Sequence, residues 1–129
     1  MKKILTLFII SISFVFAGAK HINVTPTFVE SGIKVIDIRT KGEWIQTGIV
    51  KNAITITFFD EKGRYDVTKF LQDINKHIDK TKEFAIICRT GNRTTTVANF
   101  LGKQGYNVIN LKGGIVSLKK QGYKLVPYK

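Results

Sequence analysis

The residue with the clearest capacity for chemistry is Cys88, the single cysteine of the chain. It ends the apolar run of residues 84–88 and precedes a short polar loop, residues 89–93, after which a helical pattern begins near Thr94. Backbone N–H groups at such a strand-to-helix turn stabilise an anion, and so does the helix dipole. Two arginines in the loop add positive charge. These features favour the thiolate, which is the nucleophilic form of cysteine.

The composition of the loop favours an anion site over the alternative, an inert cysteine that only ends a buried strand. Gly91 and Asn92 tolerate the left-handed backbone that a tight loop around an anion requires. We therefore predict that Cys88 is the catalytic residue. The residues predicted to bind the substrate are the six that follow it: Arg89, Thr90, Gly91, Asn92, Arg93 and Thr94.

The length of the loop disfavours one class of cysteine enzyme. Cysteine-dependent phosphatases use the pattern Cys-x5-Arg, and in this chain the arginine position is occupied by Thr94. Arg93 comes one residue too early for the loop to surround a tetrahedral phosphate in that way. The loop fits a smaller group on the sulfur atom, so arsenate or phosphate ester chemistry is not expected.

The elements that must position this loop alternate between strands and helices. Apolar, β-branched runs predict strands at residues 34–39, 53–58, 83–88 and 106–111, with a short edge strand at 22–24. Apolar spacings of three and four predict helices at residues 40–47, 67–78 and 94–104, with a last short helix from 115 to about 122. This order predicts the α/β class, a mostly parallel sheet with helices on both faces. Ligands of such sheets bind at the carboxyl ends of the strands, where Cys88 lies.

The N-terminus has the pattern of a secretory signal peptide. Two lysines precede an apolar run from Ile4 to Phe16, and Ala17-Gly18-Ala19 forms a small-residue cleavage site. The run is shorter than the roughly 20 residues of a membrane-spanning helix. We predict a signal peptide at residues 1–19 and one domain at residues 20–129, periplasmic or secreted and not inserted in a membrane. An uncleaved N-terminal anchor is the alternative.

Charge and composition limit the partners. The 129-residue chain has a net charge of +12, and removal of residues 1–19 with their two lysines leaves +10. In the cytosol this charge would suggest nucleic acid, but export removes that partner. A single cysteine excludes a disulfide framework and a Cys-x-x-Cys redox centre, and an unpaired thiol in an exported protein suggests a function.

Other polar residues are assigned structural roles. Asp37 lies in an apolar strand, where a charge is costly unless paired, and Arg39 is the available partner. Trp44 is expected to anchor its helix in the core. His21 and His77 share no metal-ligand spacing with Cys88, so no metal and no cofactor are predicted.

Four segments, in this order along the chain, resemble a single-domain rhodanese, a sulfurtransferase. They are Val35–Arg39 with Glu43-Trp44, similar to the D-x-R…E-[FWY] signature; Thr47–Ala53, similar to G-H-I-P-G-A; Cys88–Arg93, similar to the active-site loop C-R-x-G-x-R; and Leu111–Ile115, similar to L-x-G-G-[IV]. The resemblance spans about residues 22–123. Gly48 stands where histidine is common and Leu118 where tryptophan often stands, and both departures concern packing rather than the loop.

The resemblance implies a rhodanese-like three-layer fold and a two-step reaction through a Cys88 persulfide. The thiolate would take sulfane sulfur from thiosulfate or a polysulfide, and cyanide or a thiol would accept it. Backbone N–H groups of residues 89–93 would hold the charge of the outer sulfur. Arg93 is favoured as a residue that holds the anionic donor, whereas the role of Arg89 is left open. Either arginine could instead be structural, paired with Asp37 or Glu43.

Two other functions stay open. The protein could be a periplasmic persulfide carrier that delivers sulfur to a partner enzyme. It could also be a non-catalytic rhodanese-like module that binds anions or another protein. The sequence does not name the physiological donor, the acceptor or the oligomeric state.

Overall fold

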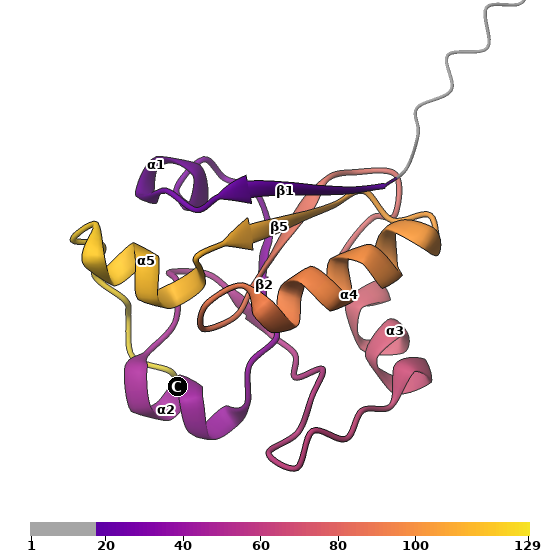
Figure 1. The fold of residues 1–129 in the computed structure, drawn as a ribbon, viewed down its shortest axis with the longest axis horizontal. Coiled ribbons are helices and arrows are strands. Elements are labelled where there is room, and N and C mark those ends of the chain that lie inside the picture. The colour runs from indigo at the N-terminus through magenta and orange to yellow at the C-terminus, as the bar shows by residue number, and fades with distance from the viewer. Residues whose placement is uncertain (1–17) are drawn as a thin grey trace, which may run out of the picture.

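The computed structural model describes residues 18–129, in which strands and helices alternate along the chain (Figure 1). The strands are β1 (Ala19–Asn23), β2 (Val35–Asp37), β3 (Ile54–Thr55), β4 (Phe84–Ile87) and β5 (Val108–Lys112). The helices are α1 (Pro26–Val29), α2 (Lys41–Thr47), α3 (Val67–Asn75), α4 (Asn92–Lys103) and α5 (Gly114–Lys120). This alternation confirms the predicted α/β class.

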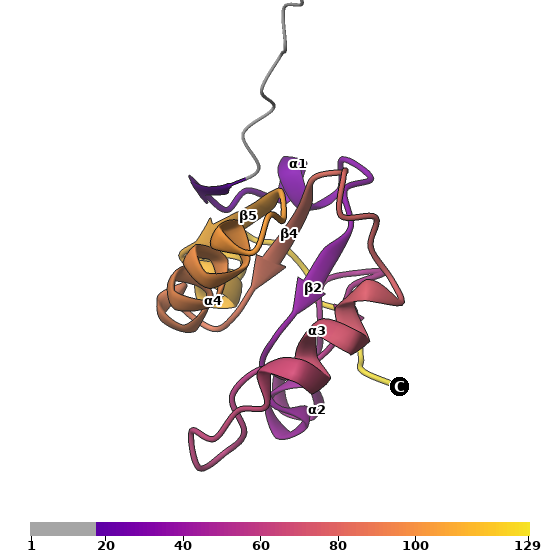
Figure 2. The same cartoon turned by 90° about the vertical axis from the view of Figure 1, so that its right-hand side faces the viewer.

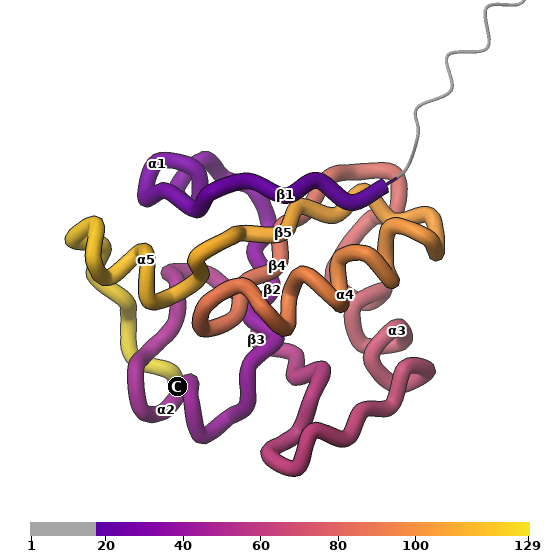
Figure 3. Tube along the Cα trace, in the orientation of Figure 1, coloured from indigo at the N-terminus to yellow at the C-terminus, as the bar shows by residue number. Residues whose placement is uncertain are grey.

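The five strands form one sheet in the order β1-β5-β4-β2-β3, and every neighbouring pair is parallel (Figure 3). Because the strands are parallel, their carboxyl ends lie at one edge of the sheet. The β4 strand is central and fully buried, and Cys88 follows it directly at that edge. The predicted location of Cys88 at the ligand-binding edge of a parallel sheet is therefore confirmed.

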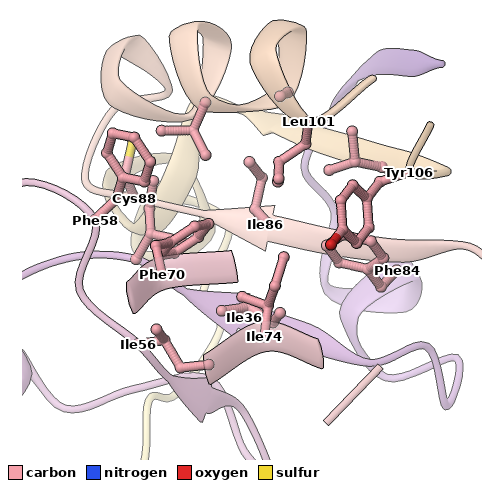
Figure 4. Packing of buried hydrophobic residues seen from close by; sticks show 14 residues of the cluster. Ile36, Ile56, Phe58, Phe70, Ile74, Phe84, Ile86, Cys88, Leu101 and Tyr106 are labelled. Carbon is pink, nitrogen blue, oxygen red and sulfur yellow. The ribbon is translucent and has the colours of Figure 1, made fainter. Parts of the chain in front are cut away.

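Helices cover both faces of the sheet, and Figure 2 shows α1 and α4 on opposite sides of β4 and β5. One hydrophobic cluster joins the sheet to α3 and α4, and a second joins it to α1 and α5. Successive residues of β4 alternate between the clusters, as the pleat of a strand requires. Phe84, Ile86 and Cys88 enter the first cluster (Figure 4), whereas Ala85 and Ile87 enter the second. The thiol therefore points to the face covered by α3 and α4.

The structure differs from the sequence expectations at several element ends. The edge strand β1 covers residues 19–23 instead of 22–24, and α3 ends at Asn75 instead of residue 78. The β3 strand has only two residues, although the next N–H groups of Ile56 and Phe58 still donate to carbonyls of β2 and its extension. The sequence analysis did not predict α1, which begins with an N-capping Thr25 followed by a proline, a typical helix start.

The predicted signal peptide lies almost entirely outside the described residues. Its last residue, Ala19, is the first residue of β1 and pairs with Val108, so the predicted cleavage point lies within this strand. Within residues 18–129, no helix is long and apolar enough to cross a membrane.

A buried ion pair lies where β2 leads into α2. The Arg39 guanidinium donates to both carboxylate oxygens of Asp37 at 2.9–3.1 Å, to Thr47 Oγ1 at 2.8 Å and to the Gly48 carbonyl at 2.9 Å. Arg39 is 1% exposed and Asp37 is not exposed at all. The expected structural pairing of these two residues is confirmed, and it also ties the carboxyl end of α2 to the sheet.

We predict that Arg39→Ala lowers the free energy of unfolding by about 3–5 kcal/mol, because it leaves the buried Asp37 carboxylate without its counter-ion. Chemical denaturation monitored by Trp44 fluorescence measures this loss. The exposed pair of Lys69 and Asp73 provides the control, since Lys69→Ala should change stability little. A similarly small effect for Arg39→Ala would contradict a structural role for the pair.

Candidate active site

The loop between β4 and α4 encloses the thiol. Cys88 is 1% exposed, and α4 begins four residues later with Asn92. Gly91 precedes the helix with a φ of 98°, in the left-handed region that glycine adopts without strain. A Cβ atom at Gly91 would also lie 3.1 Å from the Gly113 nitrogen. The expectation that Gly91 permits a tight loop is confirmed, whereas Asn92 takes a helical conformation instead.

Two groups of the loop contact the sulfur atom. The Gly91 N–H donates to Cys88 Sγ at 3.2 Å, and Thr94 Oγ1 lies 3.4 Å from Sγ. Thr94 is fully buried and its hydroxyl is also within reach of the Gly91 carbonyl, at 3.2 Å. The Gly91 N–H is therefore a donor directed at the sulfur, whereas the single hydroxyl proton of Thr94 can go either to the sulfur or to the Gly91 carbonyl.

Two carbonyl groups, those of Cys88 and Arg89, accept hydrogen bonds from the start of α5. The Ile115 N–H donates to the Cys88 carbonyl and the Val116 N–H to the Arg89 carbonyl, both at 3.0 Å. This contact depends on Gly114, because a Cβ atom there would lie 2.6 Å from the Arg89 oxygen. The glycine pair at the start of α5, Gly113 and Gly114, therefore lets the helix N-terminus approach the loop, and two N–H groups of its first turn find partners there.

The two arginines of the loop have different environments. Arg93 makes a bidentate ion pair with Glu43 of α2, with N–O distances of 2.7 and 2.8 Å. This hydrogen bonding lowers the pKa of Glu43 below its ordinary value and raises that of Arg93. Arg89 is exposed and has no side-chain partner among residues 18–129. The sequence analysis named Glu43 as one candidate partner, and the structure selects it for Arg93.

The remaining predicted residues contribute little contact with the thiol. The side chains of Thr90 and Asn92 are exposed, and neither contacts the sulfur. A residue that the sequence analysis missed is Phe58, which belongs to the same hydrophobic cluster as Cys88 and is drawn beside it in Figure 4. Phe58 follows the short strand β3, far from Cys88 in sequence, and no local pattern connects the two.

A pocket of about 420 Å³ adjoins the loop on the α2 and α5 side. Arg89, Glu43, Val116 and Lys119 are among its lining residues. A larger pocket of about 660 Å³ lies along β3 and α3 and includes Phe58 in its wall. Within residues 18–129, no group of three or more His, Cys, Asp or Glu side chains is placed to hold a metal ion.

Comparison with known proteins agrees with this fold. Residues 27–121 match the family model of the rhodanese-like domain. A protein named sulfurtransferase from Allochromatium vinosum is 30% identical over 95 residues, which are 73% of this chain and 78% of that protein. An uncharacterised protein of Rickettsia prowazekii, RP600, is 34% identical over 85 residues, 62% of this chain and 67% of that protein.

The crystal structure of a rhodanese-related protein from Thermoplasma volcanium has the same fold. It superposes with a TM-score of 0.63 at 29% identity and covers 83% of this chain and 97% of its own. The chain therefore belongs to the rhodanese-like domain family, as the resemblance of its motifs implied. The names of its relatives support a rhodanese-type sulfurtransferase in general.

We predict that Glu43→Gln removes a pH-dependent part of the stability. Because the pKa of Glu43 is lowered in the folded protein, chiefly by its hydrogen bonds from Arg93, the charged carboxylate stabilises the fold above its ordinary pKa of 4.5. This contribution is lost as the pH falls through the lowered value. Thermal unfolding between about pH 3 and about pH 7 should show a difference from wild type that is largest near neutrality and shrinks in acid.

Glu61 is exposed and provides the control substitution, Glu61→Gln. Its melting temperature should differ from that of wild type by the same amount at every pH. A difference for Glu43→Gln that stays constant down to the lowest pH would show that the carboxylate charge does not stabilise the pair.

Proposed function

We propose that the protein is a sulfurtransferase that carries sulfane sulfur as a persulfide on Cys88. The observation that carries this proposal is the contact of the Gly91 N–H with Cys88 Sγ at 3.2 Å, in a loop whose carbonyls are turned away toward α5. In a Cys88 persulfide, the outer sulfur would be bonded to Sγ. The Gly91 N–H, which contacts Sγ, would therefore also lie close to the outer sulfur. The five-residue loop at positions 89–93 leaves room for the outer sulfur of a persulfide better than for a phosphate.

In the first step, the Cys88 thiolate attacks the outer sulfur of thiosulfate. An S–S bond forms to Cys88, the S–S bond of the donor breaks, and sulfite leaves with the electron pair. With a polysulfide, the leaving group is a chain shorter by one sulfur. No oxidant is required, because the sulfane sulfur already has the oxidation state of the persulfide.

In the second step, an acceptor attacks the outer sulfur of the persulfide. Cyanide leaves as thiocyanate, whereas a thiolate becomes a new persulfide, and Cys88 returns to the thiolate. Donor and acceptor thus react in turn at one atom, which implies ping-pong kinetics.

The charges around the loop suit anionic donors. Arg89 is exposed and lines the 420 Å³ pocket together with Lys119, so both cations can attract a dianion. Arg93 is engaged by Glu43, which leaves Arg89 as the arginine better placed to bind a donor. This assignment reverses the preference drawn from the sequence alone, and substitution of each arginine tests it.

We predict that the purified protein gains the mass of one sulfur atom when it is exposed to thiosulfate or, separately, to polysulfide. The gain should disappear on addition of cyanide and should be absent from Cys88→Ser, because the persulfide needs the thiol. Intact-mass spectrometry measures both, and the two donors are compared by the fraction of protein loaded.

Alkylation of Cys88 in the untreated protein is the control for an accessible thiol. A thiol that is alkylated but gains no sulfur from either donor would contradict the sulfurtransferase and favour the anion- or protein-binding module. Stable loading with slow release to cyanide would instead identify a persulfide carrier that needs a protein acceptor.

We also propose that the protein is exported and that residues 1–19 are removed in the process. The basic start, apolar run and Ala17-Gly18-Ala19 site support this proposal. N-terminal sequencing of the protein recovered from its native compartment should begin at Lys20, and an intact Met1 or a cytoplasmic location would contradict export.

A further inference from the structure

The Gly91 residue that contacts the sulfur is also held by its carbonyl group. The Thr95 hydroxyl donates to the Gly91 oxygen at 2.7 Å, the shortest of the contacts on this oxygen. The Thr95 backbone N–H lies at 3.0 Å and the Thr94 hydroxyl at 3.2 Å. The N–H and the carbonyl of Gly91 flank a single Cα atom, and a Cβ built on it would lie 3.1 Å from the Gly113 nitrogen and 3.4 Å from the Lys112 Cα atom, so the loop packs closely against that backbone. Holding the carbonyl therefore limits the directions in which the Gly91 N–H can point.

A buried asparagine of the neighbouring strand reaches the Thr95 hydroxyl. Asn110 of β5 is fully buried, and its Nδ2 group donates to Thr95 Oγ1 at 3.0 Å. A threonine hydroxyl that bonds back to the preceding helical turn is common by itself. Here the hydroxyl oxygen also accepts from a fully buried amide, which leaves the hydroxyl proton for the Gly91 carbonyl.

His21 of β1 holds the other hydrogen of the same amide group. Asn110 Nδ2 lies 2.9 Å from His21 Nδ1, and His21 Nε2 lies 3.1 Å from Asn99 Oδ1 on α4. Because an amide nitrogen can only donate, Nδ1 is the acceptor and the proton of the ring is on Nε2. We call the chain of hydrogen bonds through His21, Asn110 and Thr95 the Asn110 network.

The orientation of the Asn110 amide decides where the Thr95 proton goes. Asn110 Oδ1 is buried and has no hydrogen-bond partner among the described residues. Half a turn of the amide would bring this oxygen to Thr95, whose single hydroxyl proton would then leave the Gly91 carbonyl. The observed orientation leaves one acceptor without a partner and keeps the Thr95 proton on Gly91.

We propose that Asn110 and Thr95 are positioning residues, which orient the Gly91 N–H toward the Cys88 sulfur and thereby set the reactivity of the thiol. His21 supports them by holding the amide of Asn110. This inference rests on the proposed function, in which Cys88 is the nucleophile. Neither residue contacts the sulfur, and both act through Gly91.

Two substitutions of Thr95 test the network. Thr95→Val keeps the shape of the side chain and removes the hydroxyl, so alkylation of Cys88 by iodoacetamide at neutral pH should slow by about threefold to tenfold, the range expected for loss of one net hydrogen bond. Thr95→Ser keeps the hydroxyl and should restore the wild-type rate. Thr96→Val is the matched control, because Thr96 is exposed like Thr95 but contacts neither Gly91 nor Asn110, and it should alkylate like wild type.

His21→Ala tests the distant end of the network at an exposed position, where loss of folding is not expected. It should slow alkylation in the same direction as Thr95→Val but by a smaller factor. Thermal unfolding of each variant, measured in parallel, separates reactivity from stability.

The proposal is overturned if Thr95→Val alkylates at the wild-type rate, with or without a lower melting temperature, because Thr95 would then only stabilise the helix. It is also overturned if Thr95→Ser is as slow as Thr95→Val. Alkylation requires no sulfur transfer, so the test is independent of the persulfide. A wild-type protein that is alkylated but gains no sulfur would contradict the proposed function. The alkylation rates of the Thr95 variants would still decide whether the Asn110 network sets the reactivity of Cys88.

Discussion

The close approach of two backbone segments, the Cys88 loop and the glycine pair before α5, is the contact on which the rest of the site depends. The N–H groups at the start of α5 take the carbonyls of Cys88 and Arg89. With its carbonyls held on that side, the loop can direct the Gly91 N–H to the sulfur. A side chain at Gly114 would push the two segments apart, so this position controls the geometry of a nucleophile that is distant in sequence.

Helix α2 links this loop to the sheet through hydrogen bonds from Arg39 and an ion pair with Arg93. Arg39 joins the sheet to the carboxyl end of α2, and Glu43 in its first turn holds Arg93 of α4. Glu43 also completes a capping box with Thr40, which accounts for the start of the helix. One short helix thus fixes both the end of β2, the strand beside β4, and Arg93 in the first turn of α4. The Glu43 carboxylate has two roles, in the capping box of α2 and in the ion pair with Arg93.

Much of this arrangement could be predicted from the sequence. Apolar, β-branched runs predicted β2, β4 and β5, and apolar spacings of three and four predicted the helices α2 to α5, because these patterns match the geometry of the element that buries them. The predicted ends of β3 and α3 were less accurate, because backbone hydrogen bonds continue past both elements, from Ile56 and Phe58 after β3 and from Ile78 after α3. The α1 helix was missed because it has only four residues, too few to show a period.

The sequence by itself determined the proposed nucleophile, its loop and the class of fold, since these depend on residues that are adjacent or regularly spaced. Only the tertiary structure decided which partner each polar group takes. It assigned Arg93 to Glu43, left Arg89 exposed, and brought Asn110 and His21 within reach of the loop through Thr95. These contacts join residues 15 to 89 positions apart. The parallel pairing of β1, β5 and β4 brings His21 and Asn110 close to Thr95, and no local sequence pattern predicts this.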